Sequence, residues 1–376
     1  MRAAVWKNLA MYGIGLALLG WVLISHWRPE EGSSAPGLGE VFRRPIHVGP
    51  LLIALLIGAT SLFITFIRWC VLVRAQELPF SLRNGVRLGL IGYFFNTFLP
   101  GAVGGDVVKA VGIARDQERR TVAVATVLID RAIGLWAIFW FLALVGGMFW
   151  LTGQEVLVNN PPLMTLVRWS WGVVIGSIVA WVLLGFLPER RAQRFAGRLQ
   201  SIRKVGGSLA EFWRAAWLYR KRPGAILAAL GLSLVGHTGW VFMFHFAIQT
   251  FETPNASENL GTLVHHFMIV PVGLVARALI PTPGGIGGGE AVYGKLYEMI
   301  GRPASNGIMG SLAQRIVEWT LGLVGAIVFT RMRKSLPQTE VPSNDSAEPT
   351  LPTPSTNGHV HLPATETEPT AMKGQQ

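Results

Sequence analysis

Apolar stretches of membrane-spanning length recur along the chain and constrain its fold more than any other feature. A helix needs roughly 20 apolar residues to cross the hydrocarbon core of a bilayer. Seven stretches approach or exceed this length, at residues 8–25, 48–69, 123–150, 169–187, 224–250, 262–281 and 306–330. Each is apolar on all faces, as expected for helices surrounded by lipid and by one another. We therefore predict an all-α polytopic membrane protein.

The charge pattern argues against a soluble or nucleic-acid-binding protein. Only 14% of the 376 residues are charged, whereas soluble domains average about a quarter. The net charge of +12 comes from basic residues in the connectors, where they set membrane topology, and no basic domain exists to hold a duplex. The single cysteine, Cys70, excludes an internal disulfide, and no nucleotide or metal motif occurs in a supporting context. We expect no cofactor and no nucleic-acid partner.

The distribution of basic residues predicts the orientation of the chain. Connector 188–222 contains ten Lys and Arg residues, whereas connectors 151–168 and 251–261 contain one between them. We predict that residues 188–222 and the N-terminus are cytoplasmic, in a multi-pass protein of the plasma membrane. Basic residues at 331–334 also favour the cytoplasm, which requires residues 282–300 to cross and gives about eight spans. If that segment only dips into the membrane, the count is seven.

The two ends of the chain differ from the apolar body. The first apolar stretch is longer than a signal-peptide core and no convincing cleavage site follows, so we interpret it as a retained span. Residues 335–376 are rich in Pro, Thr, Ser and Glu without apolar periodicity. This composition is typical of disorder. We expect one transmembrane domain at residues 1–334 and a disordered tail at 335–376.

Two further apolar segments, at about residues 86–114 and 282–300, are interrupted by proline and glycine. Such interruptions leave backbone N–H and C=O groups unpaired, which at membrane depth is tolerated only inside protein or beside a wet cavity. Paired interrupted segments in the two halves of a chain indicate the central site of a transporter. We therefore predict two re-entrant or discontinuous helices at the functional centre.

The two interruptions align as an internal repeat. The first reads LPGAVGGD and the second reads TPGGIGGGE, with Gly289 as one inserted glycine. The resulting offset of 184 residues carries Asp106 onto Glu290, and the same offset carries Arg131 onto Arg315 in the next apolar stretch. The carboxylates can cap the restarting helices. Alternatively, the N–H groups and positive dipole ends of those helices can bind a phosphate, for which a capping carboxylate would compete.

Ionisable residues within the apolar segments are the best candidates for a binding site, because unpaired charges there are costly and usually face a bundle interior or a water path. Asp106 and Lys109 are three residues apart and can pair on one helix face, as can Arg315 and Glu318. Structural ion pairs that lock helices together are one interpretation. A polar groove for a lipid headgroup is the other, with the cations facing phosphate and the carboxylates balancing charge or carrying a proton.

The candidate substrate-binding residues are Asn96, Pro100, Gly101, Gly104, Gly105, Asp106, Lys109, Asp130, Arg131, Pro283, Gly284, Gly285, Gly287, Glu290, Gln314, Arg315 and Glu318. Arg277 and Lys295 are weaker candidates. We expect neither catalytic nor metal-binding residues.

Three motifs carry a family resemblance: Asn96-Thr-Phe-Leu-Pro100 leading into Gly104-Gly105-Asp106, the pair Asp130-Arg131, and Pro281-Thr-Pro-Gly-Gly-Ile-Gly with Glu290. At these motifs the chain resembles the lysylphosphatidylglycerol synthase transmembrane, or flippase-like, family over roughly residues 8–333. The resemblance implies a bundle of about eight helices that moves phospholipids or lipid-linked headgroups between leaflets. Synthase members also carry a soluble aminoacyl-transferase domain, so the resemblance here concerns the membrane module alone.

We therefore expect a flippase-like lipid transporter, not an enzyme, whose partners are membrane lipids. The alternative is an integral membrane enzyme acting on polyprenyl-phosphate or glycolipid substrates, with Asp106 or Glu290 as the base. A third possibility is an accessory subunit of an envelope-lipid biosynthetic enzyme.

Overall fold

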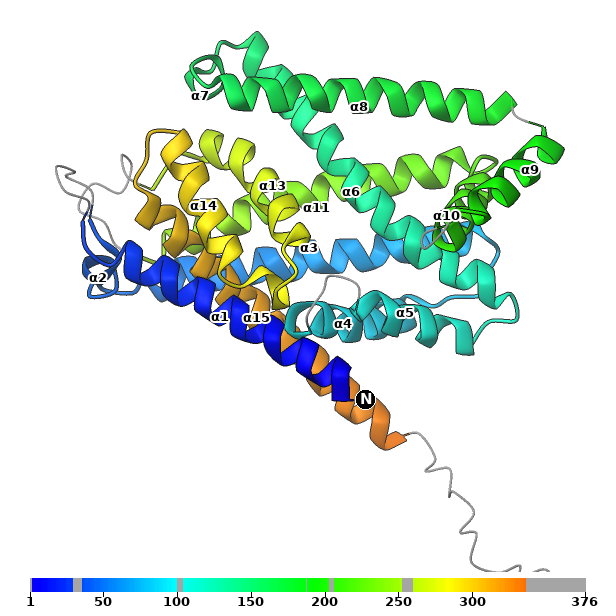
Figure 1. Ribbon diagram of the computed structural model, residues 1–376, viewed down its shortest axis with the longest axis horizontal. Helices are drawn as coiled ribbons and strands as arrows, with labels where there is room; N and C mark the ends of the chain where they lie inside the picture. The colour runs from blue at the N-terminus through cyan, green and yellow to red at the C-terminus, as the bar shows by residue number, and fades with distance from the viewer. Residues whose placement is uncertain are drawn as a thin grey trace, which may run out of the picture. The chain divides into compact units, whose positions relative to one another are not determined.

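The computed structural model describes residues 2–29, 36–99, 104–186, 188–202, 206–251 and 260–335, and these ranges are helical apart from loops and one isolated β-bridge between Ile46 and Phe251. Five helices are long and apolar enough to cross a membrane: α3 (Val48–Ala75), α6 (Arg120–Leu151), α8 (Pro161–Phe186), α11 (Pro223–Ile248) and α15 (Ala304–Ser335). Two shorter apolar helices are α13 (Leu263–Leu279) and the Leu9–Ser25 part of α1 (Arg2–Ser25). Together they account for all seven predicted stretches and confirm the all-α polytopic fold (Figure 1). Residues 336–376, nearly all of the predicted tail, lie outside the described ranges.

The remaining helices are connectors or parts of the interrupted segments. The connectors are α2 (Leu38–Val41), α7 (Glu155–Val158), α9 (Glu189–Gln200) and α10 (Gly206–Tyr219). The interrupted segments form α4 (Leu82–Phe98), α5 (Gly104–Arg115), the 3₁₀ helix η1 (Pro283–Gly285) and α14 (Gly288–Met299). Both interruptions therefore fall where proline and glycine predicted them.

The first interrupted segment is a helical hairpin in which α5 returns antiparallel along α4. The Gly105 N–H donates to Asn96 Oδ1 at 2.8 Å near the tip. Further down, Gly112 lies against Leu88, and a Cβ on Gly92 would lie 2.7 Å from Lys109 Cγ. Glycines thus allow the two helices to approach closely, as small residues do at membrane helix interfaces.

The second interrupted segment repeats this arrangement, with α14 returning along α13. Gly289 lies against Arg277 and Gly273 against the ring of Tyr293, and His266 Nε2 lies 2.8 Å from Tyr297 Oη. The twelve residues of α14 span about 18 Å, less than the roughly 30 Å of the hydrocarbon core. Helix α14 is therefore too short to cross the core by itself. Because α14 runs back along α13, the chain enters α15 from the end at which α13 began. The number of spans, seven or eight, stays a prediction.

Element lengths confirm the internal repeat. Helices α5 and α14 each contain 12 residues, and α6 and α15 each contain 32, with both pairs offset by 184 residues. Since α14 begins at Gly288, Gly289 is the counterpart of Gly105. The alignment that treated Gly289 as the insertion is thus wrong in this detail, because the extra residues lie in the loop before the helix.

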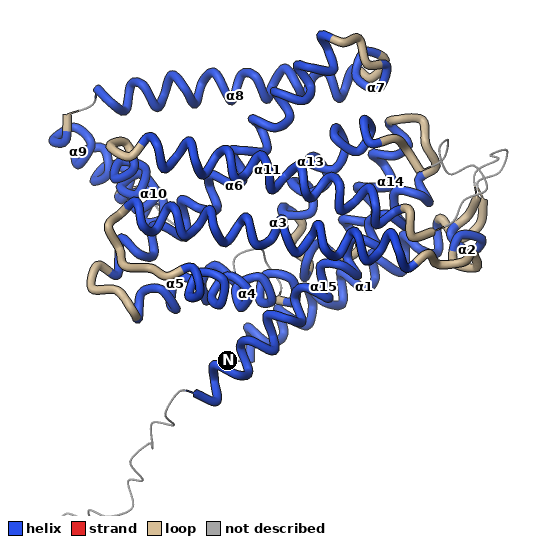
Figure 2. Tube along the Cα trace, turned by 180° about the vertical axis from the view of Figure 1, so that it is seen from behind, coloured by secondary structure: helices blue, strands red, loops and turns tan. Residues whose placement is uncertain are grey.

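Two further sets of contacts connect the remaining long helices. Helices α3 and α11 run antiparallel along each other, with Ser61 against Gly239 and Gly58 against Met243; Figure 2 shows them side by side. Helix α1 reaches both hairpin tips, because Tyr12 Oη donates to the Phe98 carbonyl and Gly15 lies against Thr282.

Replacing Gly105 with valine should destabilise the first hairpin, because a Cβ there collides with the Gly92 carbonyl oxygen. Overpacking of this kind costs about 1–3 kcal/mol. The matched control is Gly231→Val in α11, where nothing lies within 4 Å of the added Cβ. Thermal unfolding of the detergent-solubilised protein should show a lower midpoint for Gly105→Val alone. Equal midpoints for the two variants would contradict the close approach of α4 and α5.

Candidate functional site

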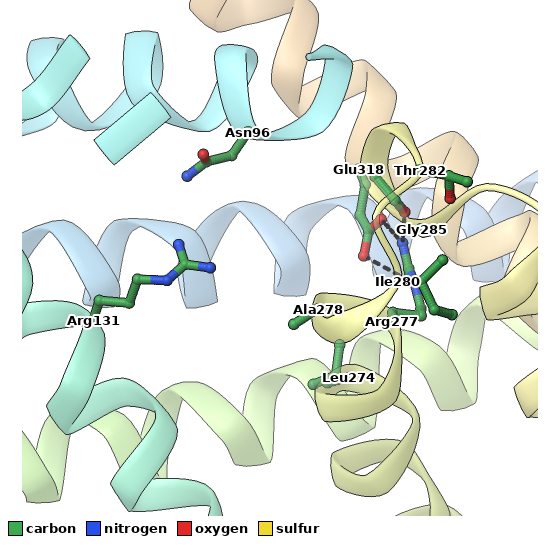
Figure 3. A pocket seen from close by; sticks show the side chains of 10 residues that line it. Asn96, Arg131, Leu274, Arg277, Ala278, Ile280, Thr282, Gly285 and Glu318 are labelled. Atoms are coloured by element: carbon green, nitrogen blue, oxygen red, sulfur yellow. Dashed lines mark hydrogen bonds and ion pairs between the residues drawn. The ribbon is translucent and has the colours of Figure 1, made fainter. Parts of the chain in front are cut away.

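The two hairpin tips meet at one place. A Cβ on Gly284 in η1 would lie 2.9 Å from the Thr97 carbonyl oxygen at the end of α4. Between the tips lies a cavity of about 200 Å³, whose polar lining comes from Asn96, Arg131, Arg277, Thr282 and Glu318. Figure 3 shows Asn96 and Arg131 on one side of this cavity and the Arg277–Glu318 pair on the other.

An adjoining cavity of about 190 Å³ shares Asn96, Gly284 and Glu318 with the first and adds Arg315 and Trp240. Both halves of the repeat therefore contribute side chains to one polar region.

The first ion pair of this region joins α5 to α6. Arg131 Nη1 lies 2.5 Å from Asp106 Oδ2, and the two side chains are 34% and 13% exposed. Arg131 thus presents part of its guanidinium to the cavity while one N–H donates to the carboxylate.

The second ion pair is the repeat counterpart of the first and joins α14 to α15. Arg315 Nη2 lies 2.5 Å from Glu290 Oε1, and the side chains are only 3% and 0% exposed. Arg315 also donates to the Gly284 carbonyl at 3.0 Å, while Glu290 accepts from the Gly287 N–H at 2.7 Å. The same interaction is therefore partly exposed in one half of the molecule and almost fully buried in the other.

Asp130 stands between two cations. It accepts from Arg68 Nε at 2.8 Å and from Lys109 Nζ at 3.3 Å, and the Lys109 ammonium lies 4.2 Å from the centre of the Trp69 ring. The sequence analysis missed Arg68, although a lone arginine inside an apolar stretch was a usable signal.

The fourth carboxylate pairs with a residue that ranked as a weaker candidate. Glu318 accepts from Arg277 at 2.6 Å and from Gln314 Nε2 at 2.7 Å. Arg277 and Gln314 are both buried, so this pair closes one wall of the cavity. Lys295, the other weaker candidate, is exposed and pairs with Glu298 at a distance of 2.7 Å.

Both pairings predicted from the spacing of three residues are wrong. Asp106 pairs with Arg131 rather than Lys109, and Glu318 pairs with Arg277 rather than Arg315. The reason is geometric, because a cation on a neighbouring helix can point directly at the carboxylate, whereas a cation three residues away on the same helix lies beside it. The prediction that a carboxylate caps each restarting helix is confirmed for Glu290, which accepts from the Gly287 N–H. For α5 the capping group is the Asn96 amide oxygen, which accepts from the Gly105 N–H, rather than Asp106.

The backbone conformations at the second tip explain why glycine occurs there. Gly284, Gly285 and Gly287 have φ angles of +54°, +70° and +81°, in the left-handed region, which glycine adopts without steric cost. Pro283 begins η1, and Gly104 begins α5. Pro100 and Gly101 lie outside the described residues.

The nine ionisable residues of this region form what we term the central charge cluster: Arg68, Asp106, Lys109, Asp130, Arg131, Arg277, Glu290, Arg315 and Glu318. Five cations face four carboxylates, so the cluster has one surplus positive charge when all are ionised. A surplus charge in an apolar surrounding is unfavourable. The surplus lies at Asp130, which faces both Arg68 and Lys109. Arg131 follows Asp130 in the chain and is the most exposed cation of the cluster, so an anion has access there.

Comparison with known proteins agrees with the fold. A family model described as "Lysylphosphatidylglycerol synthase TM region" matches residues 9–325. A UPF0104 membrane protein from Pyrococcus horikoshii is 22% identical over 310 residues, covering 76% of this chain and 88% of that protein. A UPF0104 membrane protein from Methanothermobacter thermautotrophicus is 22% identical over 306 residues, covering 75% and 84% respectively.

Removing the negative charge of Glu290 should destabilise the protein far more than removing that of Asp106. Glu290→Gln leaves the fully buried Arg315 uncompensated, at a cost of about 3–5 kcal/mol. Asp106→Asn leaves Arg131, which is 34% exposed and therefore partly hydrated. Unfolding of the two purified variants in the same detergent measures the difference. If Asp106→Asn lowers stability as much as Glu290→Gln, the contrast in burial between the two pairs is refuted.

Proposed function

The chain belongs to the lysylphosphatidylglycerol synthase transmembrane-region family, and from this premise we propose that it moves the phosphate-containing headgroup of a membrane lipid between leaflets without altering the lipid chemically. The observation that carries the proposal is the partly exposed Arg131 guanidinium, which opens into a polar cavity between two re-entrant hairpin tips. The surplus positive charge of the central charge cluster suits an anionic headgroup.

The chemistry of the cavity favours phosphate. Guanidinium groups bind phosphate oxygens through two parallel charge-assisted hydrogen bonds, and one N–H of Arg131 is already taken by Asp106. The neighbouring Asn96 amide and Thr282 hydroxyl can hydrogen-bond neutral parts of a headgroup. A volume of about 200 Å³ suits a headgroup and leaves the acyl chains in the surrounding lipid.

The two hairpins suit translocation because they would enter the membrane from opposite sides. We propose that the α4–α5 hairpin enters from the cytoplasmic leaflet and the α13–α14 hairpin from the opposite leaflet, so that their tips meet near the midplane. Entry of the α4–α5 hairpin from the cytoplasmic leaflet is supported by the basic connectors next to α4, α5 and α10. The cytoplasmic N-terminus predicted from the sequence also supports it. Two repeats of opposite orientation around a central site are typical of alternating-access transporters.

The unequal exposure of the repeated ion pairs supports an exchange between two states. In the state described, Arg131–Asp106 is partly exposed and Arg315–Glu290 is almost fully buried. Because the two halves have the same construction, the opposite state exposes Arg315–Glu290 and seals Arg131–Asp106. A headgroup held between the tips would then gain access to the other leaflet.

Liposomes containing the purified protein should translocate fluorescent phospholipids with anionic headgroups faster than protein-free liposomes. Arg131→Gln removes a charged hydrogen-bond donor, worth about 1.5–3 kcal/mol, and should slow translocation roughly 10- to 100-fold. The control is Arg115→Gln, an exposed position outside the central charge cluster. Translocation equal to that of protein-free liposomes across several headgroup classes would contradict the proposal.

The exchange of states can be tested by thiol labelling, because Cys70 is the only native cysteine and can be replaced by alanine. Ser311 is fully buried beside Glu290, and Ala313 is buried in the apolar core. A water-soluble maleimide should label Ser311→Cys slowly but measurably, whereas Ala313→Cys should stay unlabelled. Ala278→Cys, which lines the open cavity, gives the fast reference rate. If Ser311→Cys is as inert as Ala313→Cys over hours, the second state is not populated.

A further inference from the structure

Helix α8 stands apart from the other long helices. Only 11% of its apolar window is buried, against 28% to 44% in the other four. It packs on α6 through Gly146 against Val167 and Gly147 against Trp171, and Trp136 Nε1 donates to Ser177 Oγ at 2.8 Å. Figure 1 shows α8 separated from α11, with α6 passing between them.

Beyond Ser177 the two helices diverge and leave a large apolar cavity. Its volume is about 620 Å³, three times that of the central cavity, and it is lined by α6, α8, α11 and the end of α10. The walls include Ile133, Trp136, Trp181 and Ile226. The Ser177 hydroxyl is already engaged by Trp136, whereas the Trp140 indole N–H is a buried donor with no partner among the described residues. The cavity is open to the outside of the bundle, because the lining residues Ile178, Val182 and Leu227 are exposed. Hydrocarbon is the matching filler for an open apolar groove in a membrane protein.

One end of this cavity is basic. Tyr219 and Pro223 line it, and between them in the sequence lie Arg220, Lys221 and Arg222, of which Arg222 pairs with Glu77. The Arg220 guanidinium stacks on Trp217 with its carbon 3.4 Å from the ring centre, and Lys221 is exposed. The rim therefore presents positive charge directly beside an apolar pocket.

The adjoining helices extend this charge. Helix α9 has one acidic residue, Glu189, and four exposed arginines. It packs on α10 through the Trp213 indole N–H, which donates to the Ala192 carbonyl at 3.0 Å. Basic amphipathic helices next to a membrane span bind the surface of anionic lipids. Charge complementarity therefore selects an anionic lipid over a zwitterionic one.

We propose that this cavity binds one anionic glycerophospholipid, with an acyl chain between α6, α8 and α11 and its phosphate at Arg220 and Lys221. The lipid supplies the packing surface that α8 lacks against α11. It is a resident lipid, and its site is separate from the central cavity and from the translocation pathway.

Thermal unfolding of the detergent-purified protein with added phosphatidylglycerol or phosphatidylcholine tests the proposal. Phosphatidylglycerol should raise the midpoint by several degrees and phosphatidylcholine should raise it less. Ala132→Trp fills the cavity and should abolish the effect, while Ile175→Trp, on an exposed part of α8 outside the cavity lining, should retain it. Native mass spectrometry should find one phosphatidylglycerol per chain.

A charge variant keeps the test decisive if Ala132→Trp fails to fold. Arg220→Gln/Lys221→Gln should lose the preference for phosphatidylglycerol, whereas the matched exposed pair Arg83→Gln/Arg87→Gln should keep it. Arg131→Gln should retain the bound lipid, because the two sites are separate. Equal midpoint shifts with the two lipids, or equal loss in both charge variants, would overturn the proposal. So would a dimer that Ala132→Trp converts to monomer, since a second copy would then occupy the cavity.

Discussion

The arrangement of the whole centre depends on one repeated interaction, the ion pair between a carboxylate in the first turn of a returning hairpin helix and an arginine of the long helix that follows. Asp106–Arg131 and Glu290–Arg315 each join residues 25 positions apart. In apolar surroundings a carboxylate or guanidinium left without its partner is strongly destabilising. Each pair therefore fixes a hairpin against its neighbouring helix, and the two tips meet as a result.

Identical construction does not produce identical environments. Arg315 donates to carbonyls of the second tip, Ser311 donates to Glu290, and this pair is almost fully buried, whereas the Arg131 side chain is 34% exposed. This inequality gives the molecule one accessible cation in a region otherwise built from apolar helices. The surplus positive charge has another origin, because Arg68 and Lys109 share Asp130. Both features suit the anionic headgroup that we propose as the ligand.

The packing is uneven across the bundle. The core of α3, α11 and the hairpins relies on close contacts at glycines such as Gly239 and Gly105, while α8 contacts mainly α6 and borders an apolar cavity. The protein thus has a tightly packed part around the central charge cluster and an outer helix that packs mainly on α6.

The sequence by itself determined the apolar helices, the two interruptions, the offset of 184 residues and most of the ionisable residues of the centre. These features depend on local length and composition, which are legible in one chain. The tertiary structure alone decided the partners: Asp106 takes Arg131, Glu318 takes Arg277, and Asp130 takes Arg68 as well as Lys109. Sequence spacing offers only neighbours on the same helix, whereas these pairs cross between helices, and their unequal burial depends on how the hairpin tips pack.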